Sequence, residues 1–219
     1  MSAAQIPSFL PGFTAGLTAI TLAELGDKTF FIAALLATRH PRRWVFLGSV
    51  LALAGMTLLS VGIGRVVFKI LPEDLLKIIE VVLFAGFGLK LLWDAQQMPA
   101  GVENDEAADA EAIVRAADAK LQTSNAIAIV LEALTLVFVA EWGDRTQFTT
   151  IFLAAAPNLN AVGVTLGAIL GHAITAAIAV VSGRMVAQHL SEKLLYRLSG
   201  ALFLVFAAMA LLQSLNLMR

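Results

Sequence analysis

Residues 23–29 read A-E-L-G-D-K-T, and residues 140–146 repeat the pattern as A-E-W-G-D-R-T. The two stretches share Ala, Glu, Gly, Asp and Thr, and they exchange Lys28 for the equally cationic Arg145. Each stretch lies near the middle of a long apolar run. A charged side chain at bilayer depth costs about 2.5–3.5 kcal/mol on insertion scales, so these two charged motifs require a function or very good partners. We therefore predict that the two motifs form the functional site.

The composition is that of an integral membrane protein. Hydrophobic residues make up 59% of the chain, charged residues only 14%, and the mean hydropathy is +0.84. A soluble domain is nearer one quarter charged. The absence of cysteine excludes disulfides, thiolate metal sites and cysteine nucleophiles, which leaves oxygen and imidazole as metal ligands. No cofactor and no nucleic-acid partner are expected, and the sequence is compatible with a homo-oligomer.

Six apolar runs are long enough to cross a bilayer, which takes about 20 helical residues. They lie at about residues 9–37, 45–67, 75–93, 124–155, 161–186 and 194–217. The first eleven residues carry no charged side chain, so the first run is predicted to be a true span rather than a cleavable signal peptide.

The repeat extends beyond the motifs into the other spans. Two glycines lie 16 residues apart in each half: Gly48 and Gly64 in the first, Gly167 and Gly183 in the second. A Leu-Phe pair at residues 83–84 recurs at residues 202–203, and the spacing between its two copies equals the spacing between the corresponding glycines. Three spans per half is an odd number, so the second half must enter the membrane upside down. The predicted fold is all-α, with six transmembrane helices as two inverted three-helix repeats. The repeats cover residues 1–96 and 124–219, and an acidic linker covers residues 97–123.

The linker is the only hydrophilic stretch, and its six acidic and two basic side chains give it a net charge of −4. Residues 107–121 are rich in alanine and could form a surface helix. One interpretation is a solvated connection between the halves, and the other is a segment that gathers cations near the pore.

The distribution of lysine and arginine predicts the orientation, because these residues are enriched in cytoplasmic loops. Eight lie on the side of the linker and four on the other side: Arg39, Arg42, Arg43, Arg115, Lys120, Arg184, Lys193 and Arg197 against Arg65, Lys69, Lys77 and Arg219. The linker is therefore expected in the cytoplasm, with both termini outside.

Residues three apart on a helix share a face, so Glu24 and Asp27 can point the same way, and so can Glu141 and Asp144. Packing the two motif helices together would place four carboxylates around one point, and the glycine of each motif would permit the close approach. Other polar side chains would support this site with hydroxyl, amide or cationic groups: Thr29, Thr146, Gln147, Lys28 and Arg145.

An oxygen-only cage suits a hard divalent cation such as Ca²⁺, Mn²⁺ or Mg²⁺. Carboxylates held this close also take up protons when the metal leaves, because like charges repel. Competition between cation and protons for the same groups is the physical basis of antiport. The structural alternative is that Glu24 with Lys28, and Glu141 with Arg145, are ordinary ion pairs that join two helices. That alternative leaves Asp27 and Asp144 unexplained.

Two further residues have an open role. His172 lies in the middle of the fifth run, either as a histidine bonded to a neighbouring helix or as a proton acceptor and outer ligand. Glu132 precedes Glu141 by nine residues, about 13 Å along a helix, and is either a carboxylate on the cytoplasmic approach to the site or an interfacial charge.

The doubled pattern E-x-G-D-[KR]-[ST], in two inverted halves joined by an acidic loop, resembles the transmembrane-protein-165/Gdt family of the calcium/cation antiporter group. The resemblance covers essentially the whole chain. It implies exchange of manganese or calcium for protons, with the motif acids as ligands and the metal as the transported substrate. For a short chain similar to the bacterial members, it implies a bacterial inner membrane and manganese export from the cytoplasm.

Three alternatives to manganese export are carried forward. The chain could be a Ca²⁺/H⁺ antiporter, or it could be a passive divalent-cation channel. It could also be an intramembrane aspartyl protease that uses Asp27 and Asp144. The adjoining glutamates and cations disfavour the protease, because a dyad that shares one proton does not accommodate further charges beside it.

Overall fold

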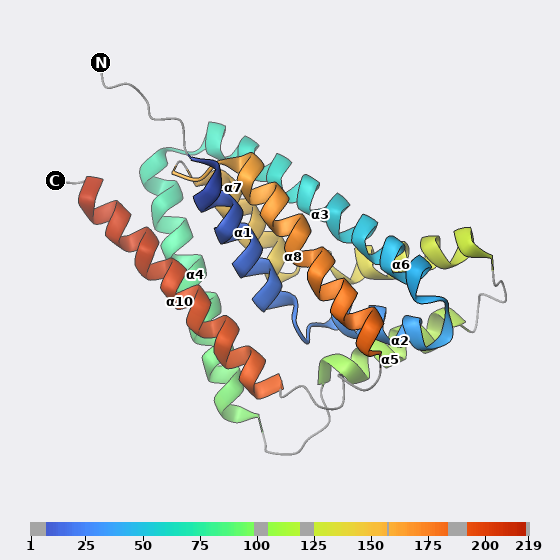
Figure 1. Ribbon diagram of the computed structural model, residues 1–219. Coiled ribbons are helices and arrows are strands. Elements are labelled where there is room, and N and C mark those ends of the chain that lie inside the picture. The colour runs from blue at the N-terminus through green and yellow to red at the C-terminus, as the bar shows by residue number, and fades with distance from the viewer. Residues whose placement is uncertain (1–7, 99–104, 119–124, 157, 184–191, 218–219) are drawn as a thin grey trace.

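The computed structural model describes residues 8–98, 105–118, 125–156, 158–183 and 192–217, and these residues form helices and short connections without a strand (Figure 1). The helices are α1 (Phe9–Glu24), α2 (Lys28–Arg39), α3 (Arg42–Ile70), α4 (Glu73–Gln97), α5 (Asp105–Asp118), α6 (Ala126–Ala140), α7 (Arg145–Ala155), α8 (Ala161–Ser182) and α10 (Glu192–Leu217). The all-α class predicted from the sequence agrees with this architecture.

Three of these helices are long and apolar enough to cross a membrane: α3, α8 and the stretch Lys193–Leu212 of α10. A fourth crossing is obtained when α6 and α7 are taken together, although they are bent by 77° at the break between them. Large apolar side chains such as Leu58, Ile78 and Val139 are exposed, as expected where lipid rather than water covers a helix. The protein is therefore an integral membrane protein.

Both motifs interrupt their helices, which corrects the prediction of continuous helices through residues 9–37 and 124–155. α1 ends at Glu24 and α2 begins at Lys28, while α6 ends at Ala140 and α7 begins at Arg145. Gly26 and Gly143 have φ angles of 77° and 84°, which side chains other than glycine rarely adopt. The motif glycines thus bend the chain at the helix breaks, whereas the sequence pattern indicated a role in helix packing.

The first break has the geometry of a type II turn. Leu25 has φ −64° and ψ 115°, Gly26 follows with its positive φ, and the amide of Asp27 donates to the carbonyl of Glu24 at 3.2 Å. The second break is closed in the same way, because the amide of Asp144 donates to the carbonyl of Glu141 at 3.1 Å. Each motif therefore places its glutamate and its aspartate at the two ends of one tight turn.

Glycines allow close contact where helices of the two halves pack. α1 lies along α8, where a Cβ atom on Gly16 would collide with the Val164 carbonyl and one on Gly167 with the Phe13 carbonyl. α3 packs against α6 and α7, and Gly48 and other glycines permit that contact in the same way. α4 lies along α10, which completes the bundle (Figure 1).

The two ends of the bundle are formed by different segments of the chain (Figure 1). The first described residues of α1 and the last ones of α10 lie at one end, which we call the terminal face. α5 and the turn between α2 and α3 lie at the opposite end, which we call the linker face. α5 packs against α2, and its Ala110 and Val114 are fully buried in the core, so this part of the linker is more than a solvated connection.

Candidate metal site

Three motif carboxylates meet between the two helix breaks. Glu24, Glu141 and Asp144 each offer an oxygen atom, and these atoms all lie within 4.8 Å of one another. Glu24 and Glu141 are each only 1% exposed, so both lie inside the protein. The group therefore combines one carboxylate from the first motif with two from the second.

A threonine of the same motif holds each glutamate. The Thr29 hydroxyl donates to Oε2 of Glu24 at 3.0 Å, and the Thr146 hydroxyl bonds Oε1 of Glu141. Thr146 also lies 3.0 Å from Oδ2 of Asp144, whose carboxylate in addition accepts the Thr146 amide. Each threonine thus fixes the direction of its glutamate, which explains why a hydroxyl follows two residues after the aspartate in both motifs.

The remaining glutamate oxygens have no hydrogen-bond donor among the described residues. These atoms are Oε1 of Glu24 and Oε2 of Glu141, and both are fully buried. A buried oxygen without a donor is costly, because burial removes its bonds to water without replacement. A cation or a proton bound between the two carboxylates would satisfy both atoms.

The fourth motif carboxylate, Asp27, makes a different contact. Its Oδ1 lies 2.7 Å from Nη2 of Arg145, which crosses from the other motif, and both side chains are largely buried. Lys28 pairs instead with Asp109 of α5 at 3.0 Å. The ion pairs considered from the sequence, Glu24 with Lys28 and Glu141 with Arg145, are thus not those that form, because the helix breaks turn both cations away from their own glutamates.

Gln147 supports the second turn with the amide oxygen that the sequence analysis offered to the site. That oxygen accepts the Gly143 amide at 2.8 Å, and the side-chain nitrogen lies 3.2 Å from the sulfur of Met56. The first copy has Phe30 at this position, so only the second turn has this brace.

His172 lies beside the carboxylates, and Glu132 lies apart from them. Nδ1 of His172 is 3.8 Å from Oε1 of Glu24, and the imidazole is 4% exposed. Glu132 is also buried, but its carboxylate faces His40 at 3.5 Å, at the end of α2 toward the linker face. The structure therefore brings His172 to the site and gives Glu132 a partner elsewhere.

Ser49 is a neighbour of the site that the sequence analysis missed. A pocket of about 10 Å³, enough for one water molecule, lies between Glu24, Ser49 and Thr175. The Ser49 hydroxyl is buried without a partner among the described residues. No sequence signal marked Ser49, because small polar residues are common where membrane helices pack.

Four helix ends converge on the carboxylates. α1 and α6 end there, so their last carbonyl groups direct partial negative charge toward the site. α2 and α7 begin there, with Asp27 and Asp144 as their N-cap residues. Broken helices of this kind are how membrane transporters place backbone oxygens and charged side chains around an ion.

Side chains of α5 and α10 cover the site toward the linker face. The Arg145 guanidinium lies 5.3 Å from the centre of the Tyr196 ring, and the Tyr196 hydroxyl is 3.3 Å from a carboxylate oxygen of Glu106. Together with the pair of Lys28 and Asp109, these contacts tie the linker helix to both motifs.

Comparison with known proteins gives the same assignment for both halves of the chain. The family model described as "Divalent cation/proton antiporter GDT1" matches residues 12–99 and 129–217. A GDT1-like protein of Synechocystis sp. is 51% identical over 202 residues, which cover 92% of this chain and 97% of the relative. No solved structure matches.

Longer plant proteins are similar as well. The chloroplastic GDT1-like protein 2 of Oryza sativa is 44% identical over 210 residues, 90% of this chain and 59% of the relative. The chloroplastic PAM71-homolog of Arabidopsis thaliana is 41% identical over 212 residues, 90% of this chain and 58% of the relative. The chain thus spans less than two thirds of these two proteins, and the family resemblance found in the motifs is confirmed. The chain belongs to the GDT1 family of divalent cation/proton antiporters.

Proposed function

We propose that this antiporter exports Mn²⁺ from the cytoplasm in exchange for protons, and that Glu24, Glu141 and Asp144 bind both substrates in turn. One observation carries the proposal: Glu24, Glu141 and Asp144 bring oxygens of both motifs within 4.8 Å of one another, and Oε1 of Glu24 and Oε2 of Glu141 are buried without a hydrogen-bond donor among the described residues. Ca²⁺ is the alternative substrate, because it prefers the same oxygen ligands.

The chemistry of the cluster links the two substrates. Three carboxylates within 4.8 Å of one another bind a divalent cation through oxygen alone, and the carbonyl ends of α1 and α6 add further oxygens. When the cation leaves, the carboxylates repel one another in a buried site, which favours proton uptake. The metal and the protons therefore exclude each other, and the site is occupied by one or the other whenever it changes its facing.

Asp27 completes the cycle from outside the cluster. In this state Arg145 holds it at 2.7 Å. Because the motifs are repeats, we propose that Arg145 releases Asp27 in the opposite-facing state, where Asp27 joins Glu24 and Glu141 at the metal.

The proposed framework is six spans in two inverted halves, with α1–α2 and α6–α7 each forming one broken span. The exchange of packing partners supports it, because α3 of the first half lies on α6 and α7 while α8 of the second half lies on α1 and α2. α4 and α10, the third helix of each half, pair with each other. The first repeat would cover residues 1–96 and the second residues 124–219, rocking about the site. The bias of basic residues supports a cytoplasmic linker face, and the similarity to the Synechocystis protein supports a bacterial inner membrane.

The protease alternative fails, because the chain belongs to a family of transporters and Asp27 is paired with Arg145 rather than with Asp144. The channel alternative is tested by transport. In proteoliposomes with the voltage clamped, an imposed pH gradient should drive Mn²⁺ against its own gradient, and a Mn²⁺ gradient should move protons in the opposite direction. Movement of metal only down its own gradient, without protons, would identify a channel. Parallel assays with Ca²⁺ identify the preferred substrate, and the Glu24→Gln/Glu141→Gln variant provides the inactive control.

A further inference from the structure

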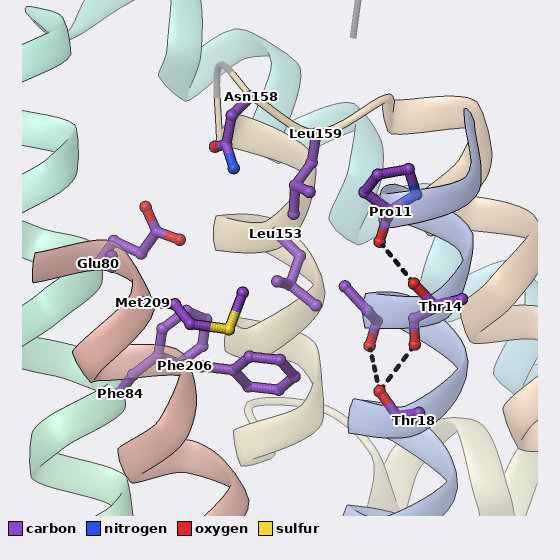
Figure 2. A pocket seen from close by; sticks show the side chains of 12 residues that line it. Pro11, Thr14, Thr18, Glu80, Phe84, Leu153, Asn158, Leu159, Phe206 and Met209 are labelled. Atoms are coloured by element: carbon purple, nitrogen blue, oxygen red, sulfur yellow. Dashed lines mark hydrogen bonds between the residues drawn. The ribbon is translucent and has the colours of Figure 1, made fainter. Parts of the chain in front are cut away.

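A cavity of about 430 Å³ lies at the terminal face, between α1, α4, α10 and the end of α7 (Figure 2). Pro11, Thr14 and Asn158 at its mouth are exposed, whereas Phe84 and Leu153 are only 1% and 2% exposed. On the measure by which the pocket of about 10 Å³ beside Ser49 holds one water, this cavity has room for many waters. It is therefore large enough for a metal ion together with its hydration shell.

Glu80 directs a carboxylate into this cavity. Figure 2 shows its side chain extending from α4 into the space between α7 and α10, on the side where Asn158 lies. Among the described residues that line the cavity, Glu80 carries the only ionisable group, and no hydrogen bond or ion pair reaches it from the described part of the chain. The apolar run at residues 75–93 would place Glu80 near its first end, where a long side chain can reach the interface. A carboxylate that faces a cavity within a membrane span is more costly than one at the interface, so we expect it to have a function.

The cavity lies in line with the carboxylate cluster. Thr18, which lines it, precedes Glu24 by six residues on α1, about 9 Å along the helix. The ring of Phe84, which lines the cavity, stacks on the ring of Phe203 with centroids 6.1 Å apart, and Phe203 is fully buried. We expect an ion that leaves the cluster toward the terminal face to enter the space that Glu80 faces.

Glu80 has no acidic counterpart in the second half of the chain. The offset that aligns residues 83–84 with 202–203 puts Ser199 opposite Glu80, and the Ser199 hydroxyl only donates to the Leu22 carbonyl at 3.0 Å. The offset of the motifs puts Ala15, on the cavity wall, opposite Glu132 of α6. Each end of the bundle thus has one buried or half-buried carboxylate at a position where the other half has none.

We propose that Glu80 forms a second cation-binding site, where a hydrated divalent cation binds between the carboxylate cluster and the terminal face. The proposal rests on the transport function proposed above. A single carboxylate acts through the water shell of the ion, while the Asn158 amide and the hydroxyls of Thr14 and Thr18 offer hydrogen-bond acceptors to that shell. Such a site binds the cation weakly, so it raises the local concentration of the cation without slowing its release.

A binding experiment with Mn²⁺ alone separates this proposal from the exchange mechanism. In the Glu24→Gln/Asp144→Asn background the cluster should lose its ion, and the electron paramagnetic resonance signal of free Mn²⁺ should still report one weak site for each chain. Adding Glu80→Gln should abolish that weak site. The matched control is Asp94→Asn, which removes a carboxylate at the other end of α4, where it pairs with Lys90 at 2.6 Å. An unchanged weak site in the Glu80→Gln protein would overturn the proposal, even if exchange itself is confirmed.

Transport gives an independent readout. In the otherwise native protein, Glu80→Gln should raise the Mn²⁺ concentration for half-maximal transport from the terminal face about tenfold. Coulomb's law gives an attraction of that size between one carboxylate and a divalent cation about 6 Å apart in water. The same concentration measured from the linker face should not change, and Glu80→Asp should restore the native value. An equal change from both faces would indicate a general structural role and would contradict the proposal.

Discussion

The guanidinium of Arg145 reaches across the repeat to the carboxylate of Asp27, 2.7 Å away, and Lys28 does not return the contact to Asp144. Lys28 is engaged by Asp109 of the linker helix instead. Two motifs that are nearly identical in sequence therefore differ in charge in this state, because one aspartate is neutralised and the other faces the glutamates. In the proposed cycle, this difference lets the two halves expose one site to one side at a time.

The first prediction follows from this asymmetry. Asp144→Asn should weaken Mn²⁺ binding more than tenfold, because it removes one of three carboxylates from the cluster. Asp27→Asn should leave binding in this state nearly unchanged and yet stop transport, because Asp27 is needed only after the change of facing. Calorimetric titration and proteoliposome uptake measure the two effects. Equal loss of affinity in both variants would contradict the asymmetric site.

Arg145 is predicted to be required for stability as well as transport. Arg145→Gln leaves Asp27 buried without its partner, and breaking a buried ion pair from one side costs about 3–5 kcal/mol. The variant should melt at a lower temperature in detergent, and the added change Asp27→Asn should recover most of that loss. The double variant serves as the control, and no recovery in it would refute the pairing.

The motif threonines are predicted to tune affinity. Thr29→Val and Thr146→Val each remove a hydroxyl that orients a glutamate, and a hydrogen bond to a charged group contributes about 1.5–3 kcal/mol. Thr146→Val should be the more damaging, because Thr146 also contacts Asp144. Thr165→Val is the control, since its hydroxyl bonds only the Ala161 carbonyl of its own helix. Equal Mn²⁺ affinity in all three variants would rule out this orienting role.

The two motif glycines should differ in their tolerance of alanine. Both adopt a positive φ, which costs another residue about 1–2 kcal/mol. At Gly26 the new Cβ would also collide with the Leu195 side chain, whereas at Gly143 nothing lies within 4 Å. Gly26→Ala should therefore lower the melting temperature further than Gly143→Ala. The opposite order would show that the contact with Leu195 does not set the difference between the two turns.

The helical class was predictable from the sequence, whereas the helix breaks at the two motifs were not. Apolar runs predicted an all-α membrane protein, and the doubled motif predicted three acids that the structure brings together, whereas the fourth, Asp27, lies in an ion pair with Arg145. The turns were missed because a spacing of three fits a continuous helix, although a glycine followed by an aspartate is also the signal for a helix end and a new N-cap. The pairing of Arg145 with Asp27 was not predictable, because the partners are 118 residues apart and Lys28 was an equal candidate.

The orientation of the chain remains a prediction that labelling can test. The native chain has no cysteine, so a single introduced thiol reports one position. A membrane-impermeant maleimide should label Ser8→Cys in intact cells but should label Asn104→Cys only after the cells are opened. Labelling of Asn104→Cys from outside would reverse the assigned direction of transport.

The distance between Arg145 and Asp27 along the chain also has a consequence for biogenesis. At about 5–20 residues per second, the ribosome adds the 118 residues that separate them in roughly 6 to 24 s. During that time the first broken helix is in or near the bilayer with a carboxylate that has no guanidinium to neutralise it. The first half therefore depends on the insertion machinery, or on a proton, until the second half arrives. Assembly of this transporter is completed by its second motif, and a nascent chain that stops before Arg145 should be recognised as unfinished and degraded.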